Sequence, residues 1–71
     1  MTDKVRALTI DELCGVLDKL QEGMETTPYL EEEQVLRGSY GVYLYQLRHQ
    51  DAQLASLYVD WMHDYKERTG L

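Results

Sequence analysis

The feature that most constrains this chain is its use of proline: the only proline is Pro28, and the 43 residues that follow it contain none. Helices accept proline in the first turn only, so a proline followed by helix formers indicates a helix start. Thr27 fits the N-cap, and the acids at 31–33 fit a first turn, where the helix dipole favours negative charge. We therefore expect one long helix over about residues 28–68, ended by Thr69-Gly70.

Positions in this segment alternate spacings of four and three, and all except Gln50 are apolar, which is the heptad signature of a packed helical seam. The predicted core or dimer seam comprises Leu36, Tyr40, Tyr43, Leu47, Leu54, Leu57 and Trp61. The phase of the seam continues through the polar residues 48–51, which favours a continuous helix. Asp51 could instead cap a separate helix that begins at Ala52, so the alternative is a compact three-helix bundle with a break near residues 49–51.

A first, shorter helix is expected over about residues 10–22. Residues 9–12, Thr-Ile-Asp-Glu, have the form of a capping box, which marks a helix N-terminus. Apolar residues then recur with the helical period, and Gly23 offers a left-handed stop. The sequence thus predicts an all-α fold, a helical hairpin that forms a single domain over residues 1–71.

The two expected helices differ greatly in length. A helix of about 40 residues measures about 60 Å, whereas one of about 13 residues measures only about 20 Å. The short helix cannot cover the aromatic side chains of the long one, and soluble monomers rarely expose a large apolar patch. A chain this small is also a marginal monomer. We therefore expect a homodimer, antiparallel and joined through the long helix.

Charge limits the kind of partner. The net charge is -6, and residues 11–33 carry eight acids against Lys19 alone, a net of -7, which leaves +1 for the remainder. Phosphate-backbone binding relies on clustered Lys and Arg, so direct binding to nucleic acid is not expected. The acidic segment suits a protein partner with a basic surface, although helix dipoles also favour several of its acids. No apolar run suits a membrane span or signal peptide, and we expect a cytoplasmic location.

Catalysis has little support in the sequence. His49 and His63 lie 14 residues apart, about 21 Å along one helix, so they cannot bind one ion within a chain. Cys14 is the only cysteine, which excludes an internal disulfide, and we interpret it as a buried structural residue. No phosphate-binding loop or nucleophile motif is present. We expect no enzymatic activity, no cofactor and no metal.

The aromatic composition favours an interaction protein. Six Tyr and one Trp supply all the aromatic surface, and these residue types are enriched at binding hot spots. The candidate partner-binding residues are Tyr45, Val42, Tyr58, Glu31, Glu32 and Glu33. We expect a non-enzymatic module that binds and modulates or inhibits a larger protein, such as a basic nucleic-acid-binding protein, as small bacterial or phage accessory proteins do. The alternative is a structural subunit or assembly factor of a larger helical complex.

Overall fold

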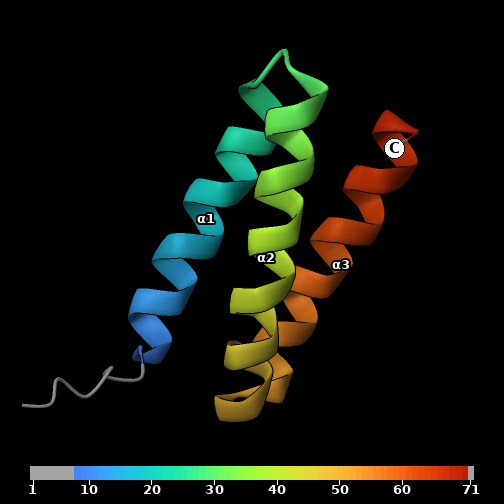
Figure 1. Cartoon of the computed structure of the whole chain (residues 1–71). Helices are drawn as coiled ribbons and strands as arrows, with labels where there is room; N and C mark the ends of the chain where they lie inside the picture. Colours follow the sequence, from blue (N-terminus) through green and yellow to red (C-terminus); the bar gives the residue numbers. More distant parts are fainter. Residues whose placement is uncertain (1–7, 71) are drawn as a thin grey trace, which may run out of the picture.

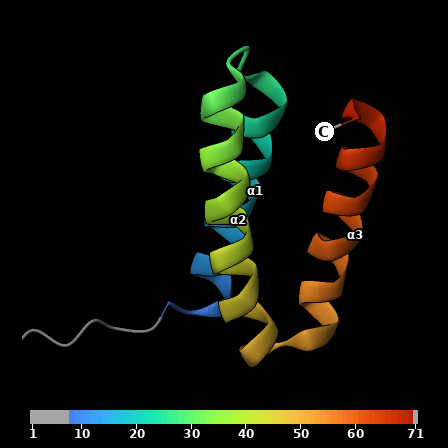
Figure 2. The same ribbon diagram turned by 45° about the vertical axis from the view of Figure 1, so that its right-hand side comes forward.

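The computed structural model of the chain describes residues 8–70, which form three α-helices and no strand. Helix α1 spans Ile10–Thr26, α2 spans Leu30–Gln50 and α3 spans Ala52–Thr69. Figure 1 shows α2 between α1 and α3, and Figure 2 shows α3 running back along α2 from the loop at Asp51. The prediction of an all-helical fold is confirmed for these residues.

The expectation of one continuous helix over residues 28–68 is wrong, because the chain leaves the helical conformation at Asp51. Its φ of -155° and ψ of 92° are extended, and its backbone N–H donates to the Leu47 carbonyl, which ends α2. The Asp51 carboxylate accepts from the Leu54 N–H at 3.0 Å and so caps α3. The interruption lies within residues 49–51, where the alternative prediction placed it. One residue thus ends one helix and begins the next.

Replacing Asp51 by alanine tests this division. We expect Asp51→Ala to lower the free energy of unfolding by about 1 kcal/mol, because the Leu54 N–H loses its acceptor at the N-terminus of α3. Urea denaturation followed by circular dichroism measures the change. Asp51→Ser is the matched control, since serine retains an N-cap oxygen. Equal stability of the alanine and serine variants would contradict a capping role.

The first helix is longer than predicted. Its capping box is present: the Glu12 N–H donates to Thr9 Oγ1 at 3.2 Å, and Thr9 N–H donates to Glu12 Oε1 at 2.9 Å. Gly23, however, does not end the helix. A Cβ there would lie 3.1 Å from a methyl group of Leu36, so this glycine allows α1 and α2 to approach closely.

The second helix begins two residues later than predicted. Thr27 is the C-cap of α1 and Tyr29 is the N-cap of α2, so Pro28 lies in the connecting loop. Thr27 still orders this loop, because its hydroxyl accepts from the Tyr29 N–H and donates to Glu32. At the other end of the chain, the predicted stop is confirmed: α3 ends at Thr69, and Gly70 adopts a left-handed φ of 72°.

The core lies where α2 meets both other helices. Its fully buried apolar members are Leu13, Leu17, Met24, Tyr40, Leu47, Ala55 and Tyr65. Most of the predicted seam belongs to this core or packs against it: Tyr40, Leu47, Leu36, Tyr43, Leu54 and Trp61. Leu57 departs from the prediction, since 64% of its surface is exposed. The break at Asp51 turns α3 back, so its inward face contains Ala55 and Tyr65 and not Leu57.

Candidate functional site

A surface pocket lies where the α1–α2 loop meets the end of α3. Its volume is about 590 Å³. The residues that line it, which we call the loop pocket, are Met24, Glu25, Thr27, Pro28, Tyr29, Leu30, Glu33, Tyr65, Arg68 and Thr69. Tyr29 and Leu30 are 64% and 55% exposed, so large apolar groups border the opening. The pocket thus combines apolar walls with charged groups of both signs.

Glu33 contributes a buried carboxylate to the loop pocket. Only 4% of its surface is exposed. Its Oε2 atom accepts from Arg37 at 2.8 and 3.1 Å, and from the Tyr65 hydroxyl at 3.0 Å. Its Oε1 atom is buried and accepts no hydrogen bond from any residue that the structure describes. An unsatisfied buried acceptor is costly, so this oxygen atom lowers the stability of the fold beside the loop pocket.

Tyr65 and Arg68 fasten the end of α3 to the other two helices. The Tyr65 hydroxyl is also 3.2 Å from the Met24 carbonyl, and burial, followed by the hydrogen bond to Glu33, raises the pKa of Tyr65. Arg68 pairs with Glu25 of α1 at 2.9 Å and with Asp64 at 2.7 Å. Exposed ion pairs contribute little to stability, so the buried Tyr65 is the main anchor of the pocket's α3 side.

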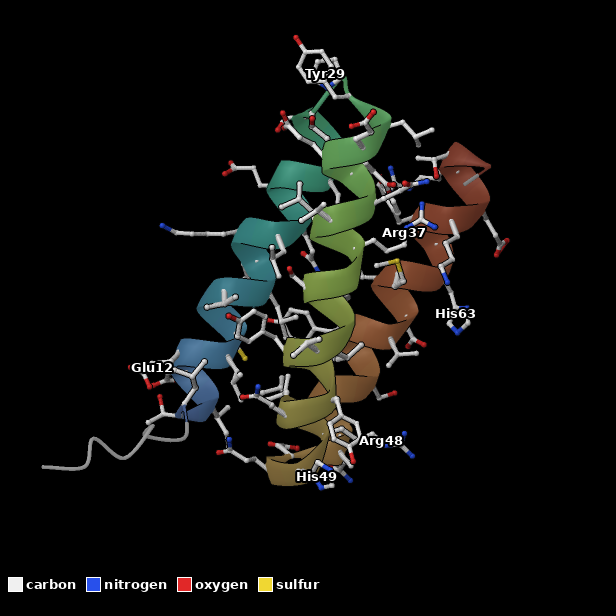
Figure 3. All side chains as sticks on the ribbon, in the orientation of Figure 1. Glu12, Tyr29, Arg37, Arg48, His49 and His63 are labelled. Atoms are coloured by element: carbon white, nitrogen blue, oxygen red, sulfur yellow. The ribbon has the colours of Figure 1, made fainter. Side chains whose placement is uncertain are left out.

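A second candidate surface is the face of α2 that points away from the core. Its six positions, which we call the outer stripe, are Glu31, Val35, Gly38, Val42, Tyr45 and His49, and all are exposed. Val35, Val42 and Tyr45 are 59–68% exposed. The rings of Tyr45 and His49 meet edge to face, with centroids 4.5 Å apart. Figure 3 shows His49 and Arg48 at the end of α2 opposite Tyr29.

The structure divides the six predicted partner-binding residues. Tyr45, Val42, Glu31 and Glu32 are exposed, the first three on the outer stripe. Glu33 is buried. Tyr58 is half-buried; its hydroxyl donates to Asp18, and its carbonyl accepts from Tyr40. Through these contacts Glu33 and Tyr58 join the helices of the fold to one another.

Three exposed residues of these surfaces were not predicted from the sequence: Val35, Leu30 and Tyr29. Val35 continues the spacing of Val42 and Tyr45, so a second heptad register could have revealed it. The exposure of Leu30 and Tyr29 was harder to predict, because it depends on α2 beginning after Pro28.

The candidate catalytic and metal-binding residues are not brought together. His49 and His63 are exposed on different helices, and Figure 3 shows His63 on the outer side of α3. Within residues 8–70, no group of three His, Cys, Asp or Glu side chains could hold a metal ion. Cys14 is half-buried and packs against the core. Burial, with hydrogen bonds to Cys14 and Asp18, raises the pKa of the nearby Tyr58.

Comparisons with known proteins identify no relative: no family model, curated protein or solved structure matches this chain. Among the described residues, no helix has the length and apolar character needed to cross a membrane.

Proposed function

We propose that this protein is a non-enzymatic protein–protein interaction module, a cytoplasmic homodimer that binds a larger protein with a basic surface and modulates or inhibits it. One observation carries the proposal: large apolar side chains are exposed along α2, outside the core. Tyr29, Leu30, Val35, Val42 and Tyr45 are each at least 55% exposed. In a small protein, such a concentration of exposed apolar surface is typical of an interaction site.

The loop pocket supplies the chemistry for a basic partner. Glu32 is exposed beside it, and the exposed Glu25 is among the residues that line it. Complementary charge would speed the encounter, while Tyr29 and Leu30 would supply the apolar contact area that gives affinity. A partner segment that carries Lys or Arg among apolar residues fits these features. Occupation of the partner's basic surface would then block its other ligands.

Reversal of one charge tests the proposal. We expect affinity capture from the native cell's lysate to recover a basic protein with the wild-type chain, and at least tenfold less with Glu32→Lys. The yield should also fall with added salt, because salt screens exposed charges. Quantitative mass spectrometry measures both effects.

The matched control is Asp60→Lys, which makes the same charge change at an exposed position of α3. It should leave the capture unchanged if the loop pocket is the binding surface. Recovery of the same proteins by wild type and Glu32→Lys would contradict the proposal.

A further inference from the structure

We propose that a second copy of this chain covers the outer stripe, with the two α2 helices antiparallel and in register about residue 40. This inference rests on the homodimer of the proposed function and adds the contact face, the direction and the register. The second copy would cover exposed apolar residues that the chain's own fold leaves uncovered. The loop pocket, lined from α1, α2 and α3, is a separate surface for the heterologous partner.

The spacing of the outer stripe is that of a helix–helix seam. Its positions alternate steps of four and three from Glu31 to His49, and they span about 27 Å of helix. None of them belongs to the chain's core, which α2 builds from another face that includes Tyr40 and Leu47. Helix α2 therefore has two heptad registers: one is buried by α1 and α3, and the other is exposed.

The stripe is complementary to itself when read in the opposite direction. An antiparallel pair centred on residue 40 places Val35 opposite Tyr45 of the second copy, and Gly38 opposite Val42 of the second copy. The end positions then pair Glu31 with His49 of the second copy, whose imidazole can donate to the carboxylate. A parallel pair would instead oppose Glu31 to Glu31 and His49 to His49. The polar end layers thus favour the antiparallel direction, and the apolar layers then pair a larger side chain with a smaller one.

Charge at the helix ends supports the same direction. The first turn of α2 contains Glu31 and Glu32, and the last turn contains Arg48 and His49. Antiparallel packing brings the acidic turn of each copy to the basic turn of the other, and it aligns the two helix dipoles favourably.

Close packing of a second helix explains the glycine at the centre of the outer stripe, Gly38. Glycine is the poorest helix former after proline, yet α2 contains Gly38 and Gly41 in its middle. A Cβ at either position would meet nothing within 4 Å, so packing within the chain does not require glycine there. In the proposed register, Val42 of the second copy lies over Gly38, where the missing side chain leaves room for it.

Oligomeric state is the first test. Sedimentation equilibrium at tens of micromolar should give a dimer for the wild type and a monomer of unchanged helicity for Tyr45→Glu, with at least a hundredfold weaker association. Leu57→Glu is the control, because Leu57 is equally exposed but lies on α3, outside the stripe. A monomeric wild type would overturn the inference, as would a dimer that Leu57→Glu disrupts and Tyr45→Glu does not.

Disulfide trapping tests direction and register. Cys14→Ala gives a cysteine-free background, into which Val35→Cys and Tyr45→Cys are introduced in separate chains. Because a disulfide requires Cα atoms within about 7 Å, oxidation should link the two variants when mixed, and neither variant to itself. Self-linking of Val35→Cys would show a parallel dimer, or an antiparallel dimer centred on residue 35, and either would overturn the inference. That result would leave the homodimer itself intact, and capture with Glu32→Lys tests the heterologous partner independently.

Discussion

Tyr40→Ala is expected to unfold the protein. Tyr40 is 1% exposed and lies at the centre of α2. Its hydroxyl donates to the Tyr58 carbonyl of α3 at 2.8 Å and accepts from Gln21 of α1 at 3.0 Å, and its ring lies 5.6 Å from that of Trp61. One side chain therefore joins all three helices.

The expected loss of stability comes from the cavity that Tyr40→Ala would leave in the core. Truncation of a large buried aromatic residue costs about 3–5 kcal/mol. A chain of this length has a total stability of only about 4–11 kcal/mol, at roughly 0.05–0.15 kcal/mol per residue. We therefore expect loss of the cooperative thermal transition, measured by far-ultraviolet circular dichroism.

Two controls separate the contributions of the ring and the hydroxyl. Tyr40→Phe keeps the ring but leaves the Tyr58 carbonyl without its donor, and should cost about 1–2 kcal/mol while the protein stays folded. Tyr29→Ala removes the same side chain from a position that is 64% exposed, and should leave the melting temperature nearly unchanged. If Tyr40→Ala melts like Tyr29→Ala, the central role of Tyr40 is wrong.

The start of the first helix and the end of the last helix could be predicted from the residues beside them. The capping box at Thr9 and Glu12 and the left-handed stop at Gly70 depend on residues within one turn, so sequence is sufficient to find them. Neighbouring residues were not sufficient to predict the role of Gly23. Its sequence context fits a helix stop, but contact with Leu36 from another helix gives it a packing role.

The break at Asp51 could not be decided from sequence, because the heptad phase continues across it. Long-range contacts decide between one helix and two: the hydrogen bond from Tyr40 to Tyr58 and the anchoring of Tyr65 form only when α3 folds back. When α3 folds back it also buries Glu33. The neighbouring residues alone suggest that Glu33 is one of three exposed acids in the first turn of a helix. Exposed residues such as Glu32 and Tyr45 were thus predictable, but Tyr29 and the loop pocket were not.

Alkaline pH is expected to destabilise the fold strongly, because the pKa values of Tyr40, Tyr58 and Tyr65 are all raised, in each case chiefly by burial. The folded state therefore favours the neutral phenols. Their contribution to stability is complete below the unfolded pKa of about 10 and is lost as pH rises from there through the raised folded values. Each unit of upward shift corresponds to about 1.4 kcal/mol, and three groups act in the same direction.

Thermal melts between about pH 8 and about pH 11 measure this loss, since the melting temperature should fall steeply only above the unfolded pKa of tyrosine. A background of Tyr29→Phe, Tyr43→Phe and Tyr45→Phe leaves Tyr40, Tyr58 and Tyr65 as the tyrosines of the ultraviolet titration. Tyrosinate absorbance from Tyr40, Tyr58 and Tyr65 should then appear together with loss of helicity. Tyr58→Phe should make the fold less sensitive to alkali, because it removes one of these groups while keeping its ring. Ionisation of all the tyrosines with helicity unchanged would show that the hydroxyls of Tyr40 and Tyr65 are not held neutral by the fold.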